Sequence, residues 1–136
     1  MPIVDTNVFI RLLTNDNAEL SPRAAAFFKD VEDGLRTIQV PEAVVAEIVY
    51  VLGSPNLYGH SRQSINEEVG YLIRLPGIEI PNKQIMLEAL SLYVDYPRLA
   101  FIDALCIAHA QRFDDATVIT FDRGYPDVEG LTRVEP

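Results

Sequence analysis

The chain has 136 residues and a net charge of −9; 49% of its residues are hydrophobic and 23% are charged. These values fit one folded domain over residues 1–136 and argue against intrinsic disorder. The acidity disfavours a general nucleic-acid-binding module, because such modules contact phosphates with a basic stripe and the eleven basic residues here are scattered.

Short apolar strands alternate with helical segments along the chain. Strand candidates cover residues 3–4, 37–40, 78–80, 116–121 and 132–134, and helix candidates begin at Thr6, Ser21, Pro41, Ser61, Lys83 and Ala100. Ser21 followed by Pro22 is typical of a helix start with serine as the N-cap, and Gly34 is expected to end that helix. Strands separated by helices predict an α/β fold with a mainly parallel central sheet.

No segment is expected to enter a membrane. The first residues lack a basic region followed by an apolar stretch, so no signal peptide is expected. The densest apolar segment, residues 44–52, is interrupted by Glu47 and is too short to span a bilayer. The lone cysteine, Cys106, cannot form an internal disulfide and is most simply a small core residue. These features predict a soluble protein in the reducing cytoplasm.

Two acids follow apolar strands directly. Asp5 ends the first strand and Asp122 follows the strand that ends at Phe121. Ligands gather at the carboxyl ends of strands in parallel α/β sheets, so this is where a site is expected. Each acid also has a purely structural interpretation: Asp5 as the N-cap of the next helix, and Asp122 as a turn residue in Asp-Arg-Gly-Tyr-Pro.

Two further acids interrupt apolar helical runs. Glu47 lies within residues 43–52 and Asp103 within residues 99–108, where nearly all neighbours are apolar. Acids are seldom buried unless they are paired or bound to a metal. The alternatives are that Glu47 marks a solvent-facing stripe and that Asp103 is a first-turn acid favoured by the helix dipole. Ala43, Val44, Tyr50 and Val51 would make a poor polar stripe around Glu47.

Four carboxylates can converge only around positive charge, because they otherwise repel one another. Oxygen ligands of this kind suit Mg²⁺ or Mn²⁺, which keep several waters and share the phosphates of a substrate. Such an ion polarises a phosphoryl oxygen and lowers the pKa of a bound water. The pattern therefore indicates phosphodiester hydrolysis.

These residues resemble the motifs of the PIN-domain nucleases, and most closely those of VapC-type toxins of prokaryotic toxin–antitoxin pairs. The similar segments are residues 3–9 with Asp5, residues 40–48 with Glu47, residues 101–105 with Asp103 and residues 118–123 with Asp122. Their order, the length of the chain and the helix-rich context agree with the family from end to end. One departure is Gly124, where some members carry a further acid, which leaves open whether one metal ion or two are held.

The resemblance implies a three-layer α/β/α sandwich and a ribonuclease site. It implies that Asp5, Glu47, Asp103 and Asp122 are catalytic acids, with Asp5, Asp103 and Asp122 as ligands of Mg²⁺ or Mn²⁺. Asn7 and Thr120 are implied as polar supports. RNA is the implied substrate, cut by a metal-activated water to leave a 5′-phosphate. The implied partner is a cognate antitoxin, and the negative charge suggests that it carries a basic segment.

Other enzyme and binding classes fit the residues less well. Phosphotransferases of the haloacid-dehalogenase type have a second aspartate two residues after the first, where this chain has Asn7, and a receiver domain needs an acid pair after its first strand. A catalytically silent PIN-like scaffold that only binds a protein stays open. A homodimer is also expected, because Val8, Phe9, Leu12 and Leu13 predict an apolar face that an isologous contact would cover.

Overall fold

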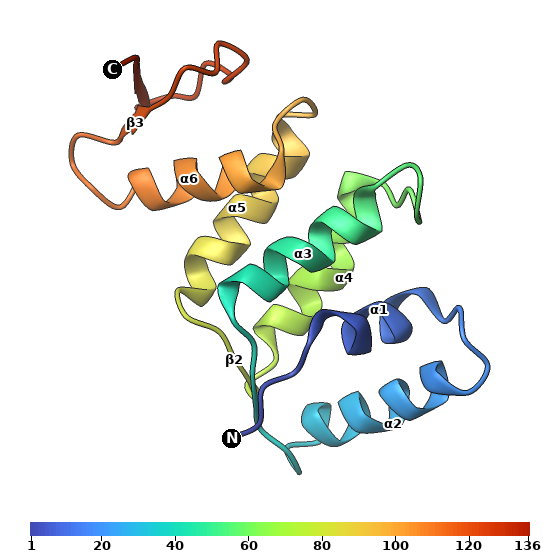
Figure 1. Cartoon of the computed structure of the whole chain (residues 1–136). Coiled ribbons are helices and arrows are strands. Elements are labelled where there is room, and N and C mark those ends of the chain that lie inside the picture. Colours follow the sequence, from blue (N-terminus) through green and yellow to red (C-terminus); the bar gives the residue numbers. More distant parts are fainter. The chain divides into compact units, whose positions relative to one another are not determined.

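The structure is a computed structural model that describes all residues from Met1 to Pro136. It divides into an N-terminal unit, Met1–Lys83, and a C-terminal unit, Gln84–Pro136. The N-terminal unit contains α1 (Thr6–Thr14), α2 (Leu20–Glu32), β1 (Ile38–Gln39), α3 (Glu42–Gly53), α4 (Arg62–Arg74) and β2 (Ile78–Glu79). The C-terminal unit contains α5 (Lys83–Asp95, which begins on the last residue of the other unit), α6 (Phe101–Ala110), β3 (Thr117–Ile119) and β4 (Thr132–Val134). Figure 1 labels most of these elements.

The first two helices pack against each other through aromatic side chains. Phe9 of α1 and Phe28 of α2 are both buried, and their ring centroids lie 4.8 Å apart. Each ring removes a large apolar area from water, which contributes about 2 kcal/mol per side chain. Figure 1 shows α1 and α2 side by side. The predicted apolar face of α1 is therefore partly wrong, because Phe9 is a core residue while Val8, Leu12 and Leu13 are half-buried.

The start of α2 differs from its prediction. The helix begins at Leu20, and the Oδ1 atom of Asn17 accepts hydrogen bonds from the backbone N–H groups of Glu19 and Leu20. Ser21 is not the N-cap; it is buried in the first turn, where its Oγ accepts a hydrogen bond from Asn17 N. The amide oxygen of Asn17 thus satisfies backbone N–H groups at the helix start, the task that the prediction gave to Ser21.

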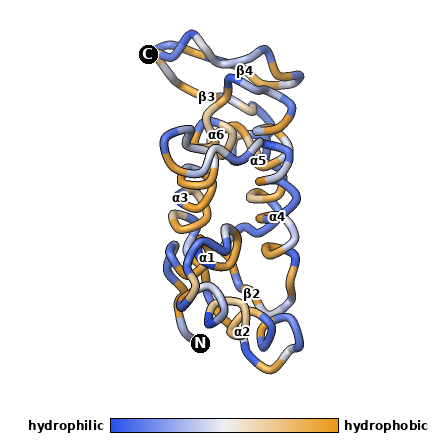
Figure 2. The backbone as a smooth tube through the Cα atoms, turned by 90° about the vertical axis from the view of Figure 1, so that its right-hand side faces the viewer, coloured by the Kyte–Doolittle hydropathy of each residue, from blue (hydrophilic) through white to orange (hydrophobic).

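Parallel pairing joins three segments of the N-terminal unit. β1 pairs with β2 in parallel, with Ile38 opposite Ile78, and Ile3 forms a parallel bridge to Gln39. Ile38 and Ile78 are almost fully buried, and Ile78 lines one apolar cavity with Ile48 of α3 and Val69 of α4. In Figure 2 the apolar run of α3 is drawn largely in orange. The predicted strand at residues 3–4 therefore exists only as a bridge, whereas the strands near residues 38 and 78 are confirmed.

The C-terminal unit combines two helices with one strand pair. β3 pairs with β4 in parallel, in the register Thr117 to Thr132. Tyr93 of α5 and Phe101 of α6 are buried and their rings meet edge to face, at a centroid distance of 5.9 Å. The predicted strands 116–121 and 132–134 are confirmed, the first in shortened form.

Helices joined to parallel strands confirm the predicted α/β class, since every strand pairing in the molecule is parallel. Two other predictions concerned membrane segments and the position of Cys106. No helix combines the length and apolar character that crossing a membrane requires. Cys106 is exposed, so its predicted place in the core is wrong.

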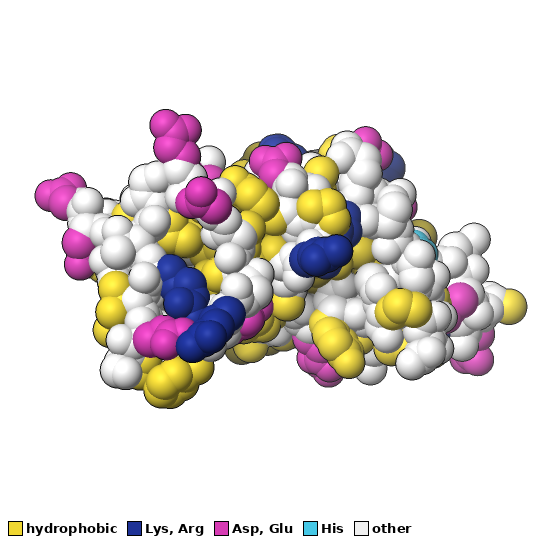
Figure 3. Space-filling view, turned by 90° about the horizontal axis from the view of Figure 1, so that it is seen from above, with side chains coloured by type: hydrophobic (Ala, Val, Ile, Leu, Met, Phe, Trp, Pro, Cys, Tyr) yellow, Lys and Arg dark blue, Asp and Glu magenta, His cyan; other side chains and the backbone are white.

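On the face drawn in Figure 3, Lys and Arg side chains lie in small separate groups among acidic ones.

Candidate active site

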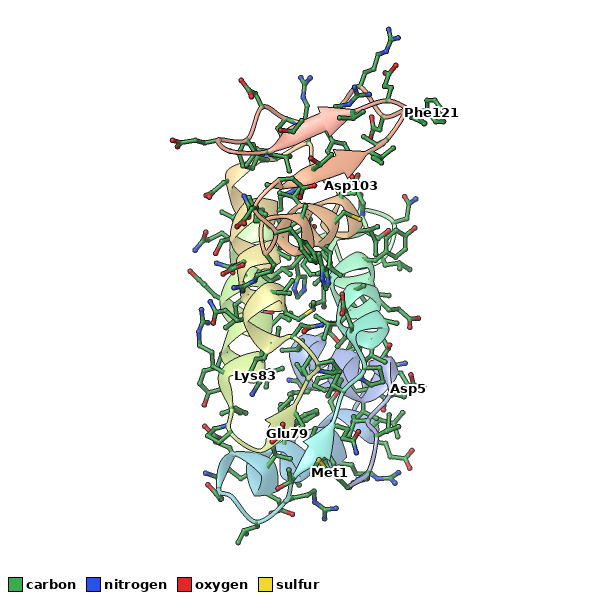
Figure 4. All side chains as sticks on the ribbon, turned by 90° about the vertical axis from the view of Figure 1, so that its left-hand side faces the viewer. Met1, Asp5, Glu79, Lys83, Asp103 and Phe121 are labelled. Atoms are coloured by element: carbon green, nitrogen blue, oxygen red, sulfur yellow. The ribbon has the colours of Figure 1, made fainter.

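Asp5 lies where the chain enters α1 (Figure 4). Its backbone is extended, and its Oδ1 accepts a hydrogen bond of 2.7 Å from Thr6 N, so Asp5 is the N-cap of α1. The structural interpretation of this acid is therefore confirmed. It does not compete with a functional one, because Asp5 stays exposed to solvent.

Thr6 links Asp5 to Glu47. Thr6 is buried, and its Oγ1 donates a hydrogen bond of 2.8 Å to Glu47 Oε2 while its backbone N–H donates to Asp5. The two acids of the N-terminal unit, 42 positions apart in sequence, are thus bound to one residue. Thr6 was missed as a site residue, because a threonine at the first position of a helix looks like ordinary helix-start chemistry.

The exposure of Glu47 corrects its predicted environment. Glu47 is exposed on a stripe of α3 that it shares with Ala43 and Tyr50, and Tyr50 is itself 72% exposed. The apolar neighbours of Glu47 in sequence do not bury it, because Val45, Ile48 and Val49 face the core on the other side of the helix. The solvent-facing interpretation of Glu47 is the one that fits its position.

Asn7 and Asp5 border a pocket between α1 and α2. The pocket measures about 640 Å³ and is lined by residues of the N-terminal segment, both helices and Arg36. Asn7 is exposed within this wall. Its predicted role as a polar support stays a prediction, and the pocket gives that side chain direct access to a bound molecule.

Asp103 lies in the first turn of α6, where the helix dipole favours a carboxylate. The hydroxyl of Tyr125 donates a hydrogen bond of 3.1 Å to Asp103 Oδ1. Burial is the largest cause that raises the pKa of Tyr125 far above its ordinary value, and the charges of Asp103 and Asp122 add to it. Tyr125 therefore stays protonated and donates its hydrogen bond to Asp103.

The turn after β3 is built around Asp122. Its Oδ1 accepts a hydrogen bond of 2.7 Å from Gly124 N, and its own N–H donates to Thr120 Oγ1 at 2.9 Å. A Cβ at Gly124 would lie 3.0 Å from Asp122 Oδ1, which is tighter than ordinary contact. Thr120 thus holds the backbone N–H of Asp122, and its role as a polar support of the site stays a prediction. Gly124 leaves room for the carboxylate to turn back on the chain.

Two of the four acids belong to each unit. Asp5 and Glu47 are joined by Thr6, and Asp103 and Asp122 both act on Tyr125. Within either unit, no three His, Cys, Asp or Glu side chains are grouped closely enough to hold a metal ion. The donors themselves fit a hard cation, because all are carboxylates and none has a Lys or Arg side chain as an ion-pair partner. Their joint action on Mg²⁺ or Mn²⁺ is therefore a proposal.

Histidines and arginines could also act on a phosphate, but several of them have contacts outside the candidate acids. His60 Nδ1 lies 3.6 Å from Glu68, and His109 is half-buried in the last turn of α6. Arg112 pairs with Glu88, and Arg123 pairs with Glu135. Tyr125 is the second residue that the sequence did not predict, because the residues after Asp122 were interpreted only as part of a turn.

Comparison with known proteins supplies the remaining evidence. A family model described as the PIN domain matches residues 3–131. A VapC ribonuclease of Aquifex aeolicus (strain VF5) is 26% identical to the chain over 136 residues, which cover 100% of this chain and 97% of that protein. The matched region includes both acid pairs, so the comparison covers every residue of the candidate site.

Proposed function

The chain belongs to the PIN domain family, and from this premise we propose that it is a metal-dependent ribonuclease. The relative from Aquifex aeolicus is named a VapC ribonuclease, which supports hydrolysis of phosphodiester bonds in RNA and a role as the toxin of a toxin–antitoxin pair. The single observation that carries the proposal is the linkage of Asp5 and Glu47 through Thr6. A purely structural N-cap does not need an acid from another helix beside it.

The site residues divide into ligands, a further acid and supports. Asp5, Asp103 and Asp122 are the proposed ligands of Mg²⁺ or Mn²⁺, and Glu47 is the fourth catalytic acid. When bound, the ion supplies an activated water and neutralises charge on the phosphate. Thr6 orients the N-terminal pair, and Thr120 and Tyr125 orient Asp122 and Asp103. Asn7, in the wall of the pocket beside Asp5, is a further proposed polar support. The whole chain, residues 1–136, is proposed to act as one nuclease domain in the cytoplasm.

Two protein partners belong to the same proposal. The chain forms a homodimer, and an antitoxin with a basic segment covers the acidic residues when the nuclease is held inactive. The net charge of −9 supports a basic partner.

Cleavage of single-stranded RNA by the purified chain tests the enzyme proposal. Wild-type protein with Mg²⁺ should cut a total-RNA pool and leave 5′-phosphate ends. Asp103→Asn should lower the rate at least about 100-fold, because the site loses one ligand charge worth several kcal/mol. Asp127→Asn removes an exposed acid of the same unit and is the matched control, with wild-type cleavage expected.

A silent scaffold gives a different pattern in this experiment. Wild-type protein that binds Mn²⁺ or RNA yet cuts nothing under any divalent cation would reject the enzyme. Equal cleavage by wild type, Asp103→Asn and Asp127→Asn would instead place the activity outside these acids.

A further inference from the structure

The pocket between α1 and α2 concentrates positive charge in an acidic protein. Three of the eleven basic residues, Arg11, Arg23 and Arg36, line it, and Asp5 is the only acid in its wall. A concave surface that gathers one sign of charge attracts ligands of the opposite sign. The pocket therefore favours an anionic ligand although the chain as a whole repels anions.

Two of these three arginines are available to a ligand. Arg23 is exposed and makes no ion pair, and the ion pair of Arg36 with the half-buried Asp30 is long, at 3.8 Å. Arg11 is held by Asp16 at 2.9 Å, yet its Nε is buried without a hydrogen-bond acceptor. A phosphate that reached this corner would supply the missing acceptor.

The rest of the lining is apolar and partly exposed. Ile3 is 66% exposed and Leu20 is 38% exposed, and Phe27 is half-buried at the wall. The guanidinium of Arg36 stacks over the Phe27 ring, with its Cζ 4.8 Å from the centroid. An aromatic face beside cations is the arrangement on which nucleic-acid bases stack in single-strand binding grooves.

The pocket is continuous with the candidate active site. Asp5 and Asn7 belong to its wall, and α2 contributes Leu20, Arg23, Ala24 and Phe27 at helical spacing, so that one face of α2 forms the opposite side. Its volume of about 640 Å³ lies within the range of small-molecule sites, about 300–1,000 Å³.

We propose that this pocket is a nucleotide subsite, which holds the single-stranded RNA next to the phosphate that is cut. Arg23 and Arg36 contact flanking phosphates, and Phe27 stacks on a base. The inference rests on the proposed ribonuclease function and adds positioning residues to it. An amphipathic peptide is the other occupant that such a lining accommodates, and it is an outcome of the test.

Fluorescence anisotropy with a 5′-labelled single-stranded oligoribonucleotide, in buffer with a chelator, measures binding apart from cleavage. The double variant Arg23→Ala, Arg36→Ala should bind at least about tenfold more weakly, and the slope of log affinity against log salt should fall by about 1.4. Phe27→Leu should weaken binding about tenfold with an unchanged salt slope, whereas Phe27→Trp should bind like wild type. Arg74→Ala, an exposed arginine of α4, is the control and should change nothing.

Thermal melts check that each variant is folded. In cleavage assays, the substitutions at Arg23, Arg36 and Phe27 should raise KM with little change in kcat. The subsite is overturned if the double variant binds RNA with wild-type affinity, or if the wild-type protein binds no RNA. It is also overturned if Arg74→Ala loses as much RNA affinity as the double variant. Unchanged RNA affinity combined with lost binding of a partner protein assigns the pocket to a peptide instead. Failure of the ribonuclease proposal gives a different result. RNA then binds, and its affinity depends on Arg23 and Arg36, but it is never cut.

Discussion

Oγ1 of Thr6 lies 2.8 Å from Oε2 of Glu47, so one hydrogen bond ties the first turn of α1 to the acid of α3. Thr6→Val keeps the shape of the side chain and removes the donor. Because Glu47 is exposed, its oxygen then turns to water, and the expected loss of stability is only about 1 kcal/mol. The expected loss in kcat is about tenfold, since Glu47 is no longer held beside Asp5.

Thr6→Ser is the matched control, because it keeps the hydroxyl, and it should retain most of the wild-type activity. Steady-state cleavage and thermal melts measure the two effects separately. If Thr6→Val cut RNA at the wild-type rate, the linkage of the two acids would have no catalytic role.

The hydrogen bond from Tyr125 to Asp103 predicts a second positioning effect. Tyr125→Phe removes one donor from the carboxylate, and kcat should fall about fivefold, which corresponds to about 1 kcal/mol. The raised pKa of Tyr125 keeps the phenol protonated well above pH 10, so the loss should not depend on pH between 7 and 10. Comparing the ultraviolet titrations of wild type and Tyr125→Phe isolates this phenol. A difference curve centred at the ordinary tyrosine pKa would contradict the assignment.

The helices were predictable because their signals are local. Ser61 at the start of α4 accepts a hydrogen bond from Ser64 N, and Gly34 adopts a positive φ of 78° just after α2. Asp5 as the N-cap of α1 and Asp122 as a turn residue were predictable for the same reason. Their immediate neighbours determine where each one lies.

The contacts of the site were less predictable, because they are made over long sequence separations. Thr6 meets Glu47 across 41 positions and Tyr125 meets Asp103 across 22, and no spacing rule relates such residues. The exposure of Glu47 was hidden for another reason. α3 is apolar on nearly every side, so the sequence period does not distinguish its exposed stripe from its core face.

Asp16 predicts a measurable pH dependence near α1. A hydrogen bond from Tyr58, 2.6 Å long, and the contact with Arg11 lower the pKa of Asp16 from 3.8 to about 2. A lowered pKa means that the ionised acid stabilises the fold above pH 3.8, and that this contribution is lost as the pH falls through 2. Carboxyl chemical shifts should place its midpoint near 2, and Tyr58→Phe should move the midpoint upward. A midpoint that stays near 3.8 in wild type would contradict the contact.

The homodimer stays a prediction, with a smaller candidate surface than the sequence indicated. Phe9 is 3% exposed and packs on Phe28, which leaves Val8, Leu12 and Leu13 as the half-buried apolar residues of α1. Light scattering should give about twice the 15.2 kDa mass of one chain. Leu12→Gln should lower the dimer fraction, whereas Leu57→Gln, an exposed leucine outside α1, should not. A monomer mass for wild type at high micromolar concentration rejects the dimer.

The last prediction is an antitoxin that inhibits through a basic segment. Without a metal ion, Asp5 and Glu47 form one acidic pair and Asp103 and Asp122 another. Arginine is the residue that best replaces the charge of the ion, because its planar guanidinium binds two carboxylate oxygens at once. A partner that places an arginine at these acids would exclude both metal and RNA. Expression of the chain alone should therefore slow growth, and expression together with the neighbouring reading frame should restore it.

The strength of that inhibition should depend on the arginine itself. Replacing the arginines of the partner's basic segment with lysine should weaken inhibition of purified nuclease, because lysine keeps the charge but loses the two-oxygen geometry. Replacing them with glutamine should weaken it further. The Asp127→Asn variant should be inhibited like wild type, since that acid lies outside both pairs. Equal growth with and without the neighbouring reading frame, once nuclease activity is demonstrated in the same cells, rejects the antitoxin and leaves the enzyme standing.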